Sequence, residues 1–390
     1  MNVFIFTPLL VLLLFYIGNI PVDQYNITSE RTIVRDTNKL FFILGTLLLV
    51  YVSGQRYAYG DTVTYMHFFE NVMPFNQCLS TFKIGEEWLF KLYLSFLHTY
   101  VSSNPRVFIE ITSFLTIFPL MYFLYNYSGD LKFAFYIFVT FGCWDHSLNG
   151  LRQYLVTSII VACFPLIAKR RWYIFFPLIF VVAQIHTSAY IWFVLYFFLY
   201  AEAWGKMTKL IIILLLIIVI ASPFMGGFID NLISDTVYGV KYVNDDWDYS
   251  INIFRVLVAA VPIAISYINR DLMKKKYKYY DIVFNMSLFF LMFTTAGIFS
   301  AVYARFNLYF EIFAVTLLVW NINEMVHIEK YHWVKIASYG LFTIYFLYQM
   351  LFAYGLNWHE RSLFFVNSWS EESWICLLYT SPSPRDRSLS

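Results

Sequence analysis

Apolar residues run through this chain in long stretches, and short polar or charged segments separate each stretch from the next. About 20 apolar residues cross a bilayer as a helix. Twelve stretches predict transmembrane helices: Val3–Ile20, Leu40–Val52, Val107–Tyr125, Phe133–Trp144, Tyr154–Ala168, Trp172–Ala183, Ala189–Tyr200, Leu210–Phe224, Ile253–Ile268, Ile282–Ala301, Phe306–Asn321 and Val334–Tyr354. Several are short because polar residues stand at their ends, which indicates a wet cavity. The pattern predicts an all-α polytopic membrane protein.

The composition agrees with this prediction. Hydrophobic residues make up 60% of the chain and charged residues only 13%, whereas a soluble domain carries about 25% charged residues. No basic stripe is interleaved with exposed aromatics, so nucleic acid is not expected as a partner. The cysteines lack ligand spacing, and we expect no cofactor and no metal cluster. An ion bound by Asp61 and the acidic 225–250 loop stays an open alternative.

The chain divides into one membrane domain, residues 1–375, and a short tail. The tail, residues 376–390, begins with a Cys376–Asp386 stretch that looks like a translated sequencing adapter, and we expect it to be an artefact. The first apolar run, Val3–Ile20, has no basic leading segment and no small-residue cleavage site. It is therefore predicted to span the membrane rather than to act as a signal peptide.

The charged loops predict the orientation in the membrane. Lys169–Arg171 and the group of Arg270 with Lys274–Lys276 are strong cytoplasmic signals. The acidic 225–250 loop is predicted to lie outside. The alternation of loops then places three polar groups at the external ends of their helices: Asn149–Gln153, His186 and Arg305.

One segment breaks the alternation. Glu86–Val101 is apolar enough to span, but a span there would place Arg56 and Asp61 in the cytoplasm. Its charged start fits a juxtamembrane or re-entrant amphipathic helix better. Glu86 and Glu87 are expected to cap this helix rather than to act as bases.

Arg152 is the most informative single residue. An arginine near the hydrocarbon region costs roughly 2.5–3.5 kcal/mol, so it needs an internal partner or an anionic ligand. Asp145, Asn149 and Arg152 are spaced i, i+4 and i+7, which places them on one face of a continuous helix. Two interpretations remain open: a structural ion pair with Asp145, or binding of an anion.

Four polar clusters share the predicted external side: Arg56–Asp61 with Tyr65; Asp145 and His146 with Asn149, Arg152 and Gln153; His186; and Arg305 with Tyr309. Guanidinium groups grip phosphate and stabilise a diphosphate as it leaves. A carboxylate or imidazole can take the proton of an attacking sugar hydroxyl. The set suits glycosyl transfer from a lipid diphosphate. Simpler explanations also stand: a capped Gly-Asp turn, an interfacial histidine and an arginine that reaches to headgroups.

These motifs resemble a known family. Arg56-x3-Gly60-Asp61-x3-Tyr65, Asn149-Gly150-Leu151-Arg152-Gln153, His186-Thr187-Ser188-Ala189 and Arg305 with Tyr309-Phe310 resemble the EpsG-type membrane proteins of exopolysaccharide biosynthesis. The resemblance runs from about Leu40 to Tyr354. It implies a Wzy-like polymerase that joins lipid-diphosphate-linked repeat units outside the plasma membrane. It also implies a GT-C-like architecture, in which a juxtamembrane helix follows an early span.

The resulting hypothesis is a membrane glycosyltransferase with these roles. The donor diphosphate binds Arg152, Arg305 and Arg56, while Asp61 or His186 orients or deprotonates the acceptor hydroxyl. The remaining substrate contacts are assigned to Asn149, Gln153, Tyr65 and Tyr309. The expected partners are polyprenyl-diphosphate-linked oligosaccharide, membrane lipid, and polysaccharide export and chain-length proteins.

Two other functions are considered. A membrane O-acyltransferase would use His186 as a base, but the excess of arginine and the lack of a His-Asp or His-Asn pairing around His186 argue against it. A non-enzymatic flippase or transporter would use the arginines only to bind lipid diphosphate.

Overall fold

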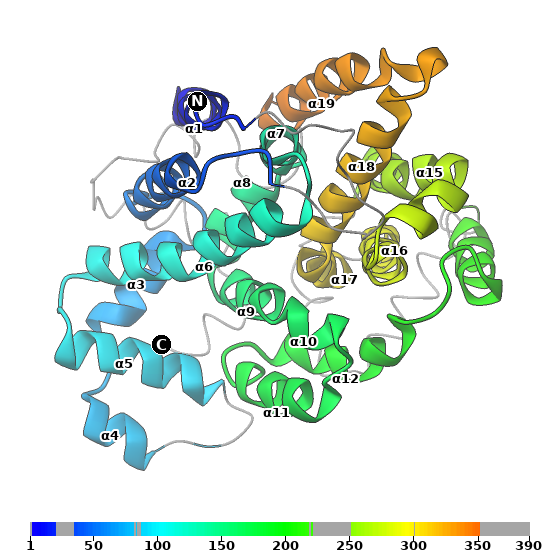
Figure 1. Ribbon diagram of the computed structural model, residues 1–390. Coiled ribbons are helices and arrows are strands. Elements are labelled where there is room, and N and C mark those ends of the chain that lie inside the picture. The colour runs from blue at the N-terminus through cyan, green and yellow to red at the C-terminus, as the bar shows by residue number, and fades with distance from the viewer. Residues whose placement is uncertain are drawn as a thin grey trace.

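Helices carry the whole fold in the part of the chain that the computed structural model describes, which is residues 2–20, 35–81, 83, 87–217, 220, 251–299 and 301–351 (Figure 1). Within these residues the β pairing is limited to one bridge between Asn19 and Thr37. The all-helical prediction is confirmed. The predictions for Glu86, for the 225–250 loop and for the 376–390 tail lie outside the described residues.

Each of the twelve predicted stretches contains helical residues, including residues 206–217. In chain order the elements are α1 (Asn2–Ile17), α2 (Lys39–Gly54), α3 (Thr62–Glu70), α4 (Phe75–Ser80), α5 (Trp88–Tyr100), α6 (Pro105–Tyr127), α7 (Leu131–Thr140), α8 (Cys143–Asn149), α9 (Leu151–Ala162), α10 (Phe164–Ala168), α11 (Trp172–Val182), η2 (Thr187–Ile191), α12 (Trp192–Leu195), η3 (Tyr196–Phe198), α15 (Ile253–Lys276), α16 (Tyr280–Ala296), α17 (Ala301–Ala304), η4 (Arg305–Tyr309), α18 (Glu311–Val326), η5 (Glu329–Tyr331) and α19 (Val334–Leu351).

Side-chain caps determine where several of these helices begin. An Asn or Asp oxygen accepts a backbone N–H of the first turn, which satisfies a group that has no partner inside the helix. Asn38 caps α2, Asn104 caps α6, Asp130 caps α7 and Asn252 caps α15. In α6 the cap is followed by Pro105, whose missing N–H costs nothing at the first helical position.

Two helices, α6 and α18, pack against several others and form the centre of the bundle. Helix α6 packs between α2 and α9, and α18 packs against α15, α16 and α7 (Figure 1). Two of the described helices, Pro105–Tyr127 and Ile253–Lys276, are both long and apolar enough to cross a membrane, and several shorter apolar helices accompany them. The count of twelve spans and the GT-C-like topology stay predictions.

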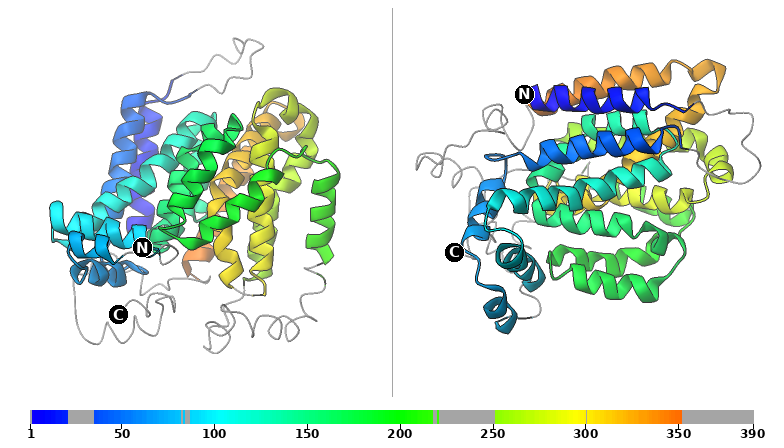
Figure 2. Two further views of the ribbon diagram at one scale, coloured as in Figure 1. Left: turned by 90° about the horizontal axis from the view of Figure 1, so that it is seen from below. Right: turned by 60° about the vertical axis from the view of Figure 1, so that its left-hand side comes forward.

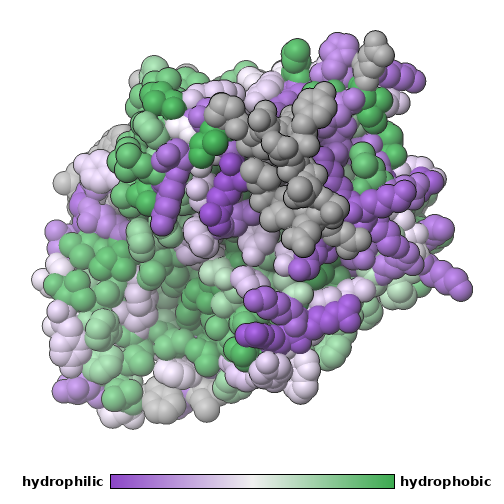
Figure 3. Space-filling model, viewed as in Figure 1, coloured by the Kyte–Doolittle hydropathy of each residue, from purple (hydrophilic) through white to green (hydrophobic). Residues whose placement is uncertain are grey.

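Large apolar side chains cover much of the outer surface. Ile336 is 74% exposed and Phe197 is 69% exposed, and leucines on α1, α2 and α19 are similarly open. On the face drawn in Figure 3, hydrophobic residues gather in a broad area on the left. A soluble monomer rarely exposes so much contiguous apolar surface. This surface is of the kind that lipid covers.

Helices α3, α4 and α5 lie together at one end of the bundle, and α5 runs across the direction of the long helices (Figure 2). This helix, Trp88–Tyr100, falls within the predicted juxtamembrane segment Glu86–Val101. Its inner side is apolar, with Phe90, Leu94 and Leu97 buried against the bundle. The position of α5 agrees with a helix that does not span.

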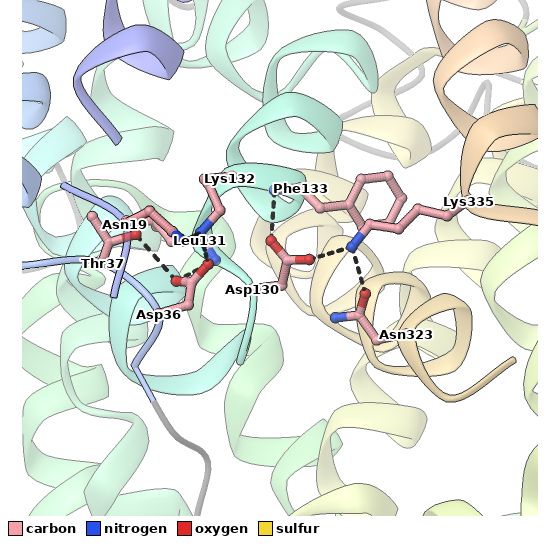
Figure 4. Close-up of polar contacts among 9 residues, drawn as sticks. All are labelled: Asn19, Asp36, Thr37, Asp130, Leu131, Lys132, Phe133, Asn323 and Lys335. Carbon is pink, nitrogen blue, oxygen red and sulfur yellow. Dashed lines mark hydrogen bonds and ion pairs between the residues drawn. The ribbon is translucent and has the colours of Figure 1, made fainter. Parts of the chain in front are cut away.

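Ion pairs fasten the opposite end of the bundle (Figure 4). The Asp36 carboxylate pairs with Lys132 and accepts the Leu131 backbone N–H at 3.1 Å. Asp130 pairs in turn with Lys335, which links α7 to α19. Nearby, Lys276 pairs with Glu324 near the end of α18. Arg270 and Lys274–Lys276 of α15, the predicted cytoplasmic signals, thus lie at the same end of the bundle as these ion pairs.

Replacing Asp36 with Ala should destabilise the protein by about 1–3 kcal/mol, because the buried Leu131 N–H loses its acceptor and Lys132 loses its carboxylate. Thermal unfolding in detergent measures this. The control is Glu202→Gln, which removes an exposed pair with Lys274 and should leave the midpoint unchanged. Equal effects of the two variants would contradict the structural role of Asp36.

Candidate functional site

Gly150 separates α8 from α9 and so shapes the centre of the site. Its ψ of 55° leaves the helical region, and each helix ends or begins there. The expectation that Asp145, Asn149 and Arg152 lie on one face of a continuous helix is therefore wrong. Asp145 accepts a hydrogen bond from the Tyr59 hydroxyl, whereas Arg152 starts a new helix and points to other partners.

Arg152 is almost fully buried and is held from several sides. Its Nη1 donates to Glu87 Oε2 at 2.7 Å, and its Nε donates to the Tyr65 hydroxyl at 2.9 Å. The guanidinium carbon lies 5.6 Å from the ring centroids of both Tyr65 and Phe90, a favourable cation–π geometry. Arg152 thus forms an ion pair with Glu87, which lies 65 positions away.

Glu87 is the residue that joins the site together. Its second oxygen, Oε1, accepts the Thr187 backbone N–H at 2.9 Å and lies 3.0 Å from His186 Nδ1. Burial alone would raise the pKa of the Glu87 carboxyl, but the hydrogen bond from His186 and the charge of Arg152 hold this pKa well below its usual range. The carboxylate is therefore ionised at neutral pH.

The backbone of Glu87 is strained. Its φ of 53° and ψ of 35° lie in the left-handed region, and its side chain makes no capping bond to α5 although it occupies the N-cap position. The prediction that Glu87 caps this helix is wrong, because its carboxylate is used by Arg152 and His186 instead. A non-glycine residue in this conformation costs about 1–3 kcal/mol and is typical of functional sites.

Gly60, Asp61 and Asn149 explain why two of the sequence motifs occur together. Gly60 has a φ of +53°, and a Cβ on it would lie 2.2 Å from Asn149 Oδ1. The same oxygen accepts the Asp61 backbone N–H at 3.2 Å. Only glycine allows this close approach, so the Gly-Asp turn is docked directly onto the end of α8.

Arg56 is enclosed rather than open. It is 2% exposed, and its guanidinium donates to Ser53 O at 2.6 Å, Ser113 Oγ at 2.7 Å and Thr62 Oγ1 at 3.1 Å. Burial lowers its pKa to about 10, with the nearby Tyr59 acting against this. The side chain remains charged at neutral pH and ties α2, α3 and α6 together beneath the site.

Hydrogen bonds of Gln153 and Tyr309 hold η4 in place. Gln153 donates from Nε2 to the Arg305 carbonyl at 2.5 Å, and the Tyr309 hydroxyl lies 2.7 Å from Ser188 Oγ. The Arg305 side chain itself is exposed. Among the described residues, none bonds to its guanidinium. Arg305 therefore offers an open positive charge beside the residues that surround Arg152.

A second cluster lies at the same end and joins His146, which the sequence placed among the polar clusters, to Glu311 and Arg255, which it did not. His146 Nδ1 lies 2.9 Å from Glu311 Oε2, and Arg255 Nη2 lies 3.3 Å from His146 Nε2. Glu311 and Arg255 stand at the starts of α18 and α15. Charged residues at the ends of apolar stretches are functional candidates by default, and that signal would have found both.

Eight predicted site residues share the end of the bundle that carries α3 and α5, opposite the Asp36 and Asp130 ion pairs: Asp61, Tyr65, Asn149, Arg152, Gln153, His186, Arg305 and Tyr309. The sequence analysis assigned Glu87 the wrong role. In the part of the chain that the structure describes, no group of three or more His, Cys, Asp or Glu residues is placed to hold a metal ion.

Comparison with known proteins identifies one family. The sequence model of the EpsG family matches residues 39–363, which is most of the chain and includes every predicted site residue. The resemblance drawn from the motifs is confirmed. No curated protein matches the chain, and no solved structure does.

Replacing Gly60 with Ala should destabilise the protein by more than about 1 kcal/mol, because the new Cβ meets Asn149 and the left-handed φ disfavours any side chain. Gly340→Ala in α19 is the matched control. A Cβ there meets nothing within 4 Å, so this variant should gain about 0.5–1 kcal/mol from helix propensity. Thermal unfolding in detergent compares them, and a harmless Gly60→Ala would refute the docked turn.

Replacing Glu87 with Gln tests the ion pairs through pH. A carboxyl whose pKa is depressed in the folded state adds stability that is fully present above its unfolded pKa, about 4.3, and is lost as the pH falls through the lower folded value. The wild type should therefore exceed Glu87→Gln by about 1–3 kcal/mol at neutral pH. This difference should shrink below about pH 4. Unfolding midpoints across pH measure it; a pH-independent difference would contradict the ionised Glu87.

Proposed function

We propose that this chain, which belongs to the EpsG family, is a membrane glycosyltransferase that joins polyprenyl-diphosphate-linked oligosaccharide repeat units into a polysaccharide outside the plasma membrane. The observation that carries the proposal is the buried Arg152, held by Glu87 and Tyr65 at the same end as the exposed Arg305. A buried arginine with an open arginine nearby is suited to a multiply charged anion.

In this proposal Arg152 and Arg305 bind the donor diphosphate. Arg152 would be costly to bury alone, and Glu87 supplies the counter-charge that keeps it in place without substrate. When the donor binds, the diphosphate oxygens supply further negative charge to both guanidinium groups. Fixed positive charges in a water-poor site stabilise the leaving diphosphate most strongly as its charge develops.

Arg152 and Arg305 together form the proposed diphosphate clamp, and the other predicted residues act around it. Arg56 fixes the loop before α3 from below, since its donors are used by Ser53, Thr62 and Ser113. The docked turn presents Asp61 beside Asn149. His186, oriented by Glu87, and Asp61 place the acceptor hydroxyl, while Asn149, Gln153, Tyr65 and Tyr309 maintain the shape of the site.

The proposed reaction needs little further chemistry. The acceptor hydroxyl oxygen attacks the anomeric carbon of the donor sugar, and the bond from that carbon to the diphosphate oxygen breaks. Diphosphate leaves without protonation, so the second carboxylic acid of a glycoside hydrolase is not required. Polyprenyl diphosphate is the second product.

One observation favours a second candidate. The sequence has no His-Asp or His-Asn pairing around His186, but the Glu87 carboxylate, 99 positions away, lies 3.0 Å from its Nδ1. A carboxylate-oriented histidine also suits an O-acyltransferase, in which it would activate a sugar hydroxyl. The arginines favour diphosphate chemistry over acyl transfer.

Replacing Arg152 with Ala in cells that lack the wild-type gene should reduce polymer formation by about 10²–10³-fold, because the leaving diphosphate loses its buried positive charge. Single repeat units on polyprenyl diphosphate should then accumulate on the outer leaflet. Gel analysis of polymer length and surface labelling of the lipid-linked sugar measure both. Arg170→Ala is the control; that side chain lies over the Tyr200 ring at the opposite end and its loss should leave the polymer intact.

Each alternative predicts a different result from the same cells. Normal polymer lengths with Arg152→Ala, in protein that is inserted at wild-type levels, would refute the assignment. Accumulation of lipid-linked units on the inner leaflet would indicate a flippase. Normal lengths together with loss of polysaccharide acylation would indicate an acyltransferase.

A further inference from the structure

His146 and Glu311 form a carboxylate–imidazole pair that the proposed diphosphate clamp does not use. Glu311 is 2% exposed, whereas the His146 side chain retains 25% of its surface. The exposed fraction of the His186 side chain is only 13%. His146 is therefore the more accessible of the two carboxylate-bound histidines at this end of the bundle.

The contacts of His146 identify which nitrogen carries the hydrogen. A guanidinium can only donate, so the contact of Arg255 Nη2 with Nε2 at 3.3 Å makes Nε2 the acceptor nitrogen. Nδ1 then carries the hydrogen and donates it to Glu311 Oε2 at 2.9 Å. An imidazole oriented in this way has a lone pair ready to take a proton. The contact with Arg255 is long, so a hydroxyl can replace it.

Groups from four helices surround the imidazole of His146. Glu311 on α18 and Arg255 on α15 contact it directly. Asp145, its neighbour on α8, accepts a hydrogen bond from Tyr59. From α19, Tyr345 lies close to Arg255, and the Cys143 thiol of α8 lies close to Glu311. The ring is thus held between a carboxyl group on one nitrogen and a guanidinium on the other.

His186 shares its carboxylate with the proposed diphosphate site. Glu87 contacts both His186 and the guanidinium of Arg152, so this carboxylate already serves to hold Arg152. The pair of His146 with Glu311 is built from other residues. Proton transfer and diphosphate binding can therefore use different side chains, as in enzymes that assign separate roles to neighbouring titratable groups.

His146 and Arg152 lie at the same end of the bundle. They stand on the consecutive helices α8 and α9, on either side of Gly150. Space beside the imidazole is kept by Gly142, where a Cβ would lie 3.4 Å from His146 Nε2 and 2.9 Å from Gln349 Oε1. Its φ of +100° also disfavours a side chain there.

We propose that His146 is the general base of the reaction and that Glu311 is its positioning residue, an inference that rests on the proposed function. The acceptor hydroxyl displaces Arg255 and donates its proton to His146 Nε2. The oxygen forms the bond to the anomeric carbon of the donor sugar, and the electron pair of the broken bond leaves with the diphosphate. His146 then releases the proton to water.

The test uses the full-length protein reconstituted in lipid, with the lipid-linked oligosaccharide extracted from cells that lack the gene as substrate. His146→Asn is the main variant, since its amide can still donate to Glu311 but has no nitrogen at the Nε2 position. It should lower kcat by about 10²–10⁴-fold and leave KM unchanged. His146→Ala should regain activity when imidazole is added. Without imidazole, the residual activity of this variant should lack the acidic limb of the pH profile.

Glu311→Gln and His186→Asn complete the set. Glu311→Gln should lower kcat and gain nothing from added imidazole, because the imidazole of His146 is still present. His186→Asn should retain the acidic limb of the pH profile. Unfolding midpoints show that each variant is folded.

Several results would overturn the inference. Wild-type kcat in folded His146→Asn would exclude His146 as the base. Rescue of His186→Ala by imidazole, with none for His146→Ala, would assign the base to His186. If the wild-type protein joins no repeat units at all, the proposed function fails, and that outcome is distinct from a wild-type protein that is active and insensitive to His146.

Discussion

The shared carboxylate of Glu87 is the interaction on which the site depends. One oxygen binds Arg152 and the other contacts His186 and Thr187, so two separate parts of the chain converge on a single side chain. A buried guanidinium without a counter-ion would be costly in this apolar bundle. The left-handed backbone of Glu87 is the strain that this arrangement tolerates, and the contacts of its carboxylate offset it.

Much of the fold follows from local pattern. Apolar stretches predicted helices at the right places, and Asn or Asp caps explain where α2, α6, α7 and α15 begin. The pattern missed the break at Gly150, because a glycine after a helical run is compatible with both a continuous and an interrupted helix. It also missed α3 and α4, whose short amphipathic turns carry little periodic signal.

The site was harder to predict, since its decisive contacts join distant residues. Arg152, His186 and Asp61, which stand in short motifs, lie at one end of the bundle, yet nothing local pairs Glu87 with residues 65 and 99 positions away. Its neighbours instead suggested a helix cap. For the same reason the contacts of His146 with Glu311 and Arg255 were not recognised, although Glu311 and Arg255 each stand at the start of an apolar helix. Tertiary pairing, rather than residue type, decided these roles.

In the proposed function, polyprenyl diphosphate leaves from a buried arginine clamp as two repeat units are joined. The most direct measurement is the ratio of polyprenyl diphosphate released to glycosidic bonds formed, by mass spectrometry, with the reconstituted protein and its lipid-linked oligosaccharide. Each glycosidic bond formed should release one polyprenyl diphosphate. Lipid-linked units that cross the bilayer intact, or sugars that gain acyl groups without release of the diphosphate, would contradict it.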